Sequence, residues 1–477
     1  MIGRSISEYV FIRLCILGLQ SIAPLSIAYL AVMPLWLSHP LLTIPGVYAL
    51  AEASFYLFVY MPRRYRMQRP TPNPPSMTHE ERKALFMQCT KVNSMTSVVG
   101  WFVGNKGRIQ RENAVDWLLC TFFPPCQGEA LDEWHDEIES YLAVLVEFIG
   151  YPLEPGRNPN VKALMLTLDP VVMRHRPLGW YAIVAIVDTI TSASLLVSGF
   201  RHYNTRKWFS SFPPRPLLSL LSRTAPETAV PYWYRPHRSP DKLPILFLHG
   251  IGIGLWPYVH FFKEIVAQDP DVGVLAIEIL PISMHMAAPP LPRDALCDAI
   301  ERILDAHALP RVVVAAHSYG TIIAAHLYRS PRLSPRVAST LFIDPIPFLL
   351  HHPAVAYNFV YRAPRGAHEW QLWYFASRDA DVARTLSRYF FWHENVLFKE
   401  DLAGKRVAVS LAERDQIVDA QEVRRYLTGE IEPSTRWVDG GGLEVLFFEG
   451  LDHATVFEAK DTRRPLMDVL HRFVREA

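Results

Sequence analysis

The sequence is poor in cysteine and has no excess of either charge. Its 477 residues include five cysteines, 48 Lys and Arg, and 47 Asp and Glu, which leaves a formal net charge of +1. Proteins that bind nucleic acid through charge show a basic excess, and this composition gives no sign of one. The chain also has no CxxC pair and no Asn-x-Ser/Thr acceptor for glycans. We therefore expect no nucleic-acid partner, no zinc site and a reducing, cytosol-facing environment.

Charge is also nearly absent from the N-terminus. The run from Leu14 to Leu37 contains no charged residue, and the run from Leu41 to Met61 contains only Glu52. Each run is long enough to cross a bilayer as a helix. Basic residues lie before the first run and after the second, which favours a hairpin with both ends in the cytosol. We predict that residues 1–69 form a membrane anchor, in the endoplasmic reticulum or a lipid droplet. A cleaved signal peptide and a soluble pair of apolar helices are the alternatives.

The region after the anchor has no recognisable arrangement of catalytic residues. Residues 70–76 contain four prolines and are predicted to form a stiff linker. Residues 77–224 are predicted to form a helical accessory region. This region contains a third apolar run, from Leu178 to Phe200, with Asp188 in its middle. Because a central carboxylate is costly in lipid, we favour a buried or membrane-surface helix there over a third span.

The pattern changes in residues 225–477. Short β-branched runs alternate with helical stretches, which predicts an α/β fold with a mainly parallel sheet and helices on both faces. We expect strands at 229–234, 243–248, 274–280, 312–316, 339–343, 407–411 and 444–448, and helices at 293–307 and 319–329.

The strand at 312–316 runs directly into the sequence Ala316-His-Ser-Tyr-Gly320. A serine at a sharp turn from strand to helix needs small residues two positions before and after it, because the turn crowds the backbone. Ala316 and Gly320 are small, although Ala stands where Gly is usual. The pattern predicts Ser318 as a nucleophile, with a helix N-cap serine as the alternative.

A serine hydroxyl needs a base to become a nucleophile. His453 follows the last predicted strand, and Asp415 follows the strand before it. This chain order of serine, acid and histidine is the order that such a fold requires. We predict that His453 is the base and that Asp415 orients it. Asp344, Asp419 and Asp452 are the alternatives for the acid.

An oxyanion requires two backbone N–H groups that point at one position. We expect them from Tyr319, which follows the nucleophile, and from Ile251 in the glycine-rich turn after the strand at 243–248. The alternative reading of this turn as a phosphate loop is disfavoured, because it lacks the lysine and the spacing of such loops. We expect no cofactor and no catalytic metal.

An insertion rich in aromatic residues lies between Asp344 and Asp401. It follows the strand after the predicted nucleophile helix, and we expect residues 345–401 to form a helical lid. Two interpretations remain open for its aromatic side chains. They line a pocket of acyl or terpenoid size, or they form the core of the lid.

These motifs resemble the α/β-hydrolase superfamily over residues 225–477. Within it, the apolar N-terminus and the stretch Leu243-Pro-Ile-Leu-Phe-Leu-His-Gly-Ile-Gly-Ile-Gly-Leu-Trp-Pro-Tyr258 resemble fungal membrane-associated members. The resemblance implies a serine esterase or lipase that acts on a hydrophobic ester or lipid-like substrate. An acyltransferase and a non-hydrolytic cyclisation or proton-transfer enzyme that use the same site are the alternatives.

Overall fold

The structure is a computed structural model of the chain. Residues 34–42, which include the end of the first N-terminal apolar run, the start of the second and the segment between them, lie outside the residues that it describes, as does Cys126, one of the five cysteines. The described residues are 2–33, 43–92, 98–104, 107–123, 132–205, 207, 209–227, 229–431 and 434–475.

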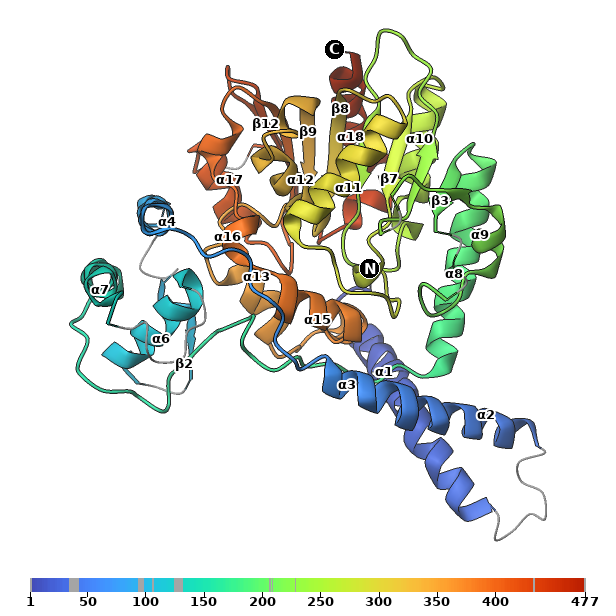
Figure 1. Ribbon diagram of the computed structural model, residues 1–477, viewed down its shortest axis with the longest axis horizontal. Coiled ribbons are helices and arrows are strands. Elements are labelled where there is room, and N and C mark those ends of the chain that lie inside the picture. Colours follow the sequence, from blue (N-terminus) through green and yellow to red (C-terminus); the bar gives the residue numbers. More distant parts are fainter. Residues whose placement is uncertain are drawn as a thin grey trace.

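A ten-stranded, mainly parallel sheet is the centre of the fold (Figure 1). The strands follow the order β11-β12-β10-β9-β8-β6-β7-β5-β3-β4. The strands from β12 to β7 pair in parallel, and β11, β5 and β3 pair antiparallel with neighbours. All residues of β6, β7 and β8 are buried, as expected for strands covered on both faces. The bounds are β3 Arg201–Asn204, β4 Arg223–Thr224, β5 Tyr232–Arg235, β6 Ile245–Leu248, β7 Val274–Ile277, β8 Val312–His317, β9 Val337–Ile343, β10 Arg406–Ala412, β11 Arg436–Val438 and β12 Leu443–Phe448.

Alternate residues of each strand divide between two hydrophobic cores. Leu246 and Leu248 of β6 contribute to the core with α11, α12 and α17, whereas Ile245 and Phe247 contribute to the core with α10 and α18. Helices therefore cover both faces of the sheet, and the predicted fold class is confirmed. The bounds are α10 Val259–Gln268, α11 Arg293–Ala306, α12 Gly320–Arg329, α17 Ala420–Thr428 and α18 Lys460–Arg475.

The sheet begins earlier in the chain than the predicted domain boundary at residue 225. β3 pairs with β5, and β4 pairs with β3, so both strands extend the sheet at its edge. The predicted accessory region 77–224 therefore contributes two edge strands as well as helices. The sequence of β3, Arg201-His-Tyr-Asn204, has only one buried position. Such a short and partly polar strand lacks the apolar run by which buried strands are recognised.

A separate small core lies in the first part of the accessory region. Helices α4 His79–Val92, α6 Arg111–Phe122 and α7 His135–Ile149 pack together there. An antiparallel pair, β1 Phe102–Val103 and β2 Lys162–Ala163, accompanies them. Figure 1 shows this group beside the lid, on the side away from α8 Leu178–Val197.

The insertion between β9 and β10 forms a helical layer at the carboxyl edge of the parallel strands (Figure 1). Its side chains pack against two other parts of the protein. Phe348 and Phe390 belong to the sheet core, and Tyr374 packs with Ile12 and Ile16 of the N-terminal helix α1, Ile6–Val32. The lid therefore lies between the sheet and the N-terminal hairpin. Its elements are α13 Ala354–Ala356, a π-helix Tyr357–Tyr361, α14 Ala367–Gln371, a π-helix Leu372–Ser377, α15 Ala380–Tyr389, α16 Trp392–Asn395 and a short helix Lys399–Leu402.

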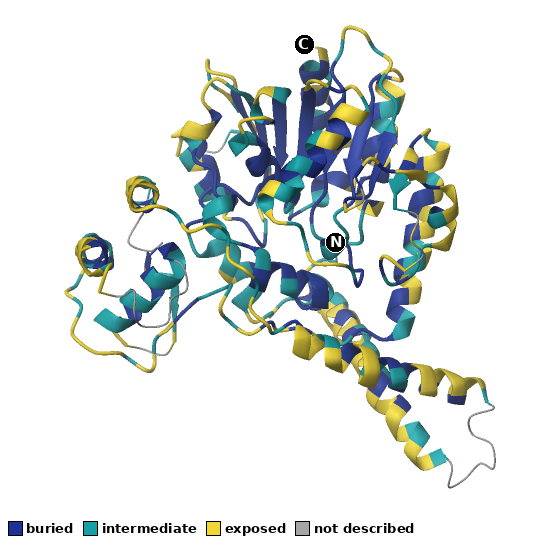
Figure 2. Cartoon of the chain, in the orientation of Figure 1, coloured by how far each residue is buried: buried dark blue, intermediate teal, exposed yellow. Residues whose placement is uncertain are grey.

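The N-terminal helices form an antiparallel pair that projects away from the sheet (Figure 1). Helix α1 spans Ile6–Val32, and the second arm joins α2 Ile44–Ser54, a π-helix Phe55–Tyr60 and α3 Met61–Arg66. Much of the surface of both arms is exposed in Figure 2. These two arms and α8 are the described helices that are long and apolar enough to cross a membrane.

The acidic residues within the apolar runs have partners inside the protein. The carboxylate of Glu52 is fully buried and accepts a hydrogen bond from the backbone N–H of Leu178, at 2.8 Å, where α8 begins. Asp188, in the middle of α8, lies 2.6 Å from His285 Nε2 and 3.4 Å from Arg215 Nε. Asp188 therefore fixes one face of α8 to the catalytic region, while Ile186 and its neighbours on the opposite face remain exposed.

Candidate active site

Ser318 lies at the turn between β8 and α12. Its φ is +50°, a strained value for a residue with a side chain, and its N–H donates to the carbonyl of Ile343 at 3.0 Å. A Cβ on Gly320 would lie only 2.1 Å from the carbonyl oxygen of Leu248. Ala316 is completely buried. The crowding on which the sequence prediction rests is therefore present at both small positions.

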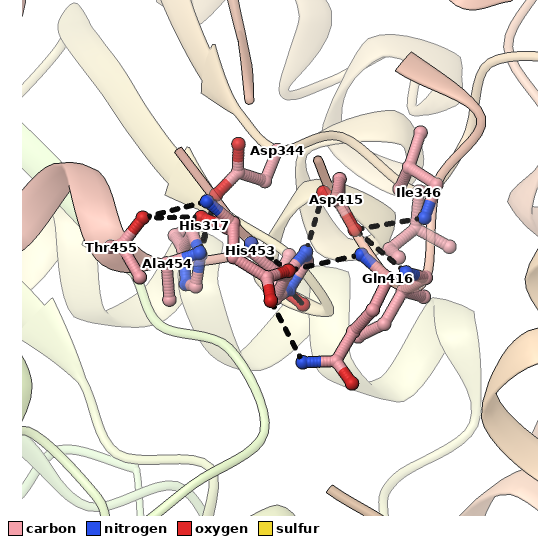
Figure 3. Close-up of polar contacts among 12 residues, drawn as sticks. His317, Asp344, Ile346, Asp415, Gln416, His453, Ala454 and Thr455 are labelled. Atoms are coloured by element: carbon pink, nitrogen blue, oxygen red, sulfur yellow. Dashed lines mark hydrogen bonds and ion pairs between the residues drawn. The ribbon is translucent and has the colours of Figure 1, made fainter. Parts of the chain in front are cut away.

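Ser318, His453 and Asp415 form one chain of hydrogen bonds. Ser318 Oγ lies 2.8 Å from His453 Nε2. His453 Nδ1 lies 2.7 Å from Asp415 Oδ2 (Figure 3). Asp415 Oδ1 accepts from the backbone N–H groups of Ile417 and Val418 at 2.8 and 3.0 Å. An ionised Asp415 accepts the proton of Nδ1, and Nε2 is then free to accept the proton of the serine.

The alternative acids have other partners. Asp344 Oδ2 accepts from the N–H of Ala454 at 2.7 Å and lies 3.5 Å from His317 Nε2 (Figure 3). Asp452 Oδ1 accepts the backbone N–H of His453 at 2.7 Å. Asp419 caps the N-terminus of α17. Asp344 and Asp452 thus hold the loop that carries His453, and Asp415 is the carboxylate that binds its ring.

The carboxylates around His453 shift the pKa of its ring. Burial lowers the pKa, but the carboxylates of Asp415, Asp344 and Asp452 outweigh burial and raise it to about 9. His317, in contact with Asp344, has its pKa lowered, chiefly by burial. The site therefore stabilises positive charge on His453, the ring next to Ser318.

The glycine-rich turn after β6 lies against the nucleophile. A Cβ on Gly250 would lie 2.7 Å from the Cβ of Ser318, so only glycine fits there. The N–H of Gly250 donates to Tyr258 Oη at 3.1 Å, and the N–H of Gly252 donates to the carbonyl of Ile282 at 3.1 Å. These bonds fix the turn on both sides of Ile251.

The two N–H groups expected to form the oxyanion hole belong to Ile251 and Tyr319. Both residues line one cavity with Ser318. Among the described residues, neither N–H has a hydrogen-bond partner. Both donors are therefore available to a substrate oxygen beside Ser318.

This cavity has a volume of about 550 Å³, within the range of small-molecule sites. The turn, the lid and, unexpectedly, the accessory region line it. The contribution of the accessory region could not be predicted, because nothing in a helix of apolar and polar residues shows which distant element it faces. Among the lining residues are Ile251, Tyr319, Ile346, Phe359, Leu386, Phe390, Phe391 and Trp392, and, from the accessory region, Phe86, Trp117, Leu119, Cys120 and Leu164.

Asp344, Asp415 and His453 offer potential metal-ligand atoms within 4.8 Å of one another. Asp415 Oδ2 and His453 Nδ1 are already hydrogen bonded to each other, and Asp344 Oδ2 accepts from Ala454. A cation bound between them would have to displace these bonds. The arrangement is therefore better suited to proton transfer than to metal binding.

A family model described as the Alpha/beta hydrolase family matches residues 245–468, slightly less than half of the chain. The match begins at β6 and includes Ser318, Asp415 and His453. Together with the sheet topology, this match identifies residues 245–468 as an α/β-hydrolase domain.

Many solved structures are similar to this chain. A carboxylesterase of the thaumarchaeon Nitrososphaera gargenis has 17% identity, with 51% of this chain and 95% of that chain covered and a TM-score of 0.36. Naproxen esterase from Bacillus subtilis has 14% identity, with 61% and 98% covered and a TM-score of 0.36. A membrane phospholipase A described as a bacterial virulence factor has 14% identity, with 63% and 94% covered and a TM-score of 0.40. No curated protein matched the chain. The assignment of the domain rests on the family model and the fold.

Proposed function

We propose that the protein is a membrane-associated serine esterase or lipase that cleaves a carboxylic ester through an acyl-enzyme on Ser318. The observation that carries the proposal is the unbroken chain of hydrogen bonds from Ser318 Oγ through His453 to Asp415. It supplies a nucleophile, a base and an orienting acid within hydrogen-bond distance of one another.

The proposed reaction has two halves. Ser318 Oγ attacks the ester carbonyl carbon as His453 Nε2 takes its proton, and the N–H groups of Ile251 and Tyr319 stabilise the oxyanion. His453 then gives the proton to the departing alcohol, which leaves the acyl group on Ser318. Water, activated by His453, releases the acid in the second half. Asp415 stabilises the imidazolium that forms in each half.

A fluorophosphonate probe tests this proposal, because it reacts covalently with activated serines. The full chain should be labelled at Ser318, and Ser318→Ala should abolish the labelling. Absence of labelling in the folded wild-type protein would disprove the mechanism.

Transfer of the acyl group to an alcohol is a second candidate. It is favoured by the burial of Ser318, which is only 4% exposed below the lid, because a covered acyl-enzyme limits the access of water. Product analysis with ester and a competing alcohol separates the two functions. Free acid as the main product would favour hydrolysis, and a new ester would favour transfer.

The membrane part of the proposal rests on the apolar surface of α1, α2 and α8. Their acidic residues Glu52 and Asp188 point to partners within the protein, which leaves the apolar side chains outside. We propose that this surface contacts the endoplasmic reticulum or a lipid droplet, with the catalytic domain in the cytosol.

Charges on the hairpin should release the protein from membranes. Leu17 and Leu25 are exposed on α1, and the double variant Leu17→Lys/Leu25→Lys should shift most of the protein from the membrane to the soluble fraction. Each lysine costs about 3 kcal/mol at the centre of a membrane helix. Vesicle flotation measures the change, with Ile431→Lys as the control, because Ile431 is also exposed but lies in the catalytic region. Equal flotation of all three proteins would contradict the proposal.

The acids around His453 should be visible in the pH profile. A general base must be neutral, so kcat/KM should rise about tenfold per pH unit until it levels near pH 9, the pKa of His453. Asp344→Asn removes one negative charge that raises this pKa, and the profile should move to lower pH. Asp419→Asn should leave it in place, because Asp419 is a helix cap. An unmoved profile in Asp344→Asn would exclude an effect of Asp344 on the base.

A further inference from the structure

The cavity at Ser318 extends beyond the catalytic domain. Close to the nucleophile its lining includes Ile251 and Tyr319, and farther along it includes the lid residues Phe359 and Leu386. It continues between the lid and the accessory helices. The accessory region is thus a wall of the candidate active site as well as a separate small core.

Helix α6 shows how this wall is made. Ala114 and Leu118 are completely buried in the accessory core. Leu119 and Cys120 of the same helix are only half-buried and line the cavity, and Leu119 also packs against this core. Helix α6 therefore contributes both to the accessory core and to the apolar lining of the cavity.

Two reciprocal hydrogen bonds hold the accessory region against the lid. The indole N–H of Trp101 donates to the carbonyl of His351 at 2.9 Å, and the indole N–H of Trp392 donates to the carbonyl of Thr121 at 2.9 Å. One indole donor belongs to the accessory region, and the other belongs to the lid. All four residues line the cavity, so these bonds join its two walls.

The charges in the lining are neutralised. Asp116 and Arg157 form an ion pair with each other at 2.8 Å. Burial lowers the pKa of His351 to about 3 and that of His393 to about 4, so both rings are neutral at neutral pH. A cavity with apolar, neutral walls favours an apolar group over a charged one, because a buried charge without a partner is costly.

We propose that this cavity, with its wall from the accessory region, binds the long hydrocarbon chain of a lipid ester while the ester carbonyl lies at Ser318. The inference rests on the proposed ester hydrolysis and adds a substrate class to it. The chain belongs to either the acyl or the alcohol side of the ester, since both present the same methylene groups.

A bulky residue on the cavity side of α6 tests the proposal. In Cys120→Trp, the full-length enzyme should lose selectivity for long esters: the ratio of kcat/KM for p-nitrophenyl laurate to that for p-nitrophenyl butyrate should fall at least tenfold. Burial of each methylene is worth about fourfold in binding, so displacement of two methylenes suffices. Dodecyl acetate against butyl acetate tests the alcohol side in the same way. Leu119→Trp is a second variant in case the first does not fold.

Val115→Trp is the matched control, because Val115 is half-buried on α6 and packs against the accessory core. Its ratios should remain within about twofold of wild type. A tenfold fall in either ester series, confined to the cavity variants, supports the proposal and shows which side carries the chain. Unchanged ratios, or an equal fall in Val115→Trp, would overturn it. Failure of the wild type to cleave any ester would instead contradict the proposed function.

Discussion

Ser318→Ala and His453→Ala should each reduce kcat by about 10⁶-fold, and the double variant should lose little more. The two side chains share one hydrogen bond of 2.8 Å and act in the same proton transfer. When either is absent, the other has no step to perform, so their effects are not additive. Steady-state hydrolysis of p-nitrophenyl butyrate by detergent-solubilised protein measures the three rates.

Ser339→Ala is a matched control for this loss. Ser339 is a buried serine in the neighbouring strand β9, and its replacement should leave kcat within about twofold. If the fold reduction in kcat of the double variant equalled the product of the two single reductions, Ser318 and His453 would act independently. The shared proton transfer would then be wrong.

The sheet was largely predictable because its central strands are buried on both faces. Such strands are continuous apolar runs, as in Val312-Val-Val-Ala-Ala316, and the run is visible without any knowledge of its neighbours. The edge strands β3 and β11 have exposed positions and short, partly polar sequences. Their place in the sheet is decided by pairing with a distant strand, which leaves no local pattern.

The same distinction applies to the candidate site. Ser318 could be predicted from the local pattern of the turn after a strand. His453 and Asp415 could be predicted because each follows a strand that is itself visible in the sequence. The accessory wall depends on contacts such as Trp101 with His351, between residues 250 positions apart. The partners of Asp188 on α8 are equally remote, since His285 is 97 positions away. Contacts of this kind depend on the three-dimensional packing and have no signal in periodicity or spacing.

Asp415→Asn should reduce kcat by about 10⁴-fold, although asparagine has nearly the same shape as aspartate. The backbone N–H groups of Ile417 and Val418 both donate to Asp415 Oδ1, so the amide oxygen of asparagine should take that position. Its NH₂ group would then face His453 Nδ1, at the place of the present acceptor Oδ2. Nδ1 would have to accept a hydrogen bond, and the ring would carry its proton on Nε2. In that tautomer His453 cannot take the proton of Ser318.

Asp344→Asn is the matched control for Asp415→Asn, because Asp344 is also a buried carboxylate near His453. Asparagine can keep the acceptor for the N–H of Ala454, and the tautomer of His453 is not determined by this side chain. The plateau of kcat should remain within about tenfold of wild type while the pH profile moves. Because fluorophosphonate labelling also needs the base, its rate should fall strongly in Asp415→Asn and slightly in Asp344→Asn. If Asp344→Asn lost more kcat and more labelling rate than Asp415→Asn, the role of orienting acid would belong to Asp344 instead.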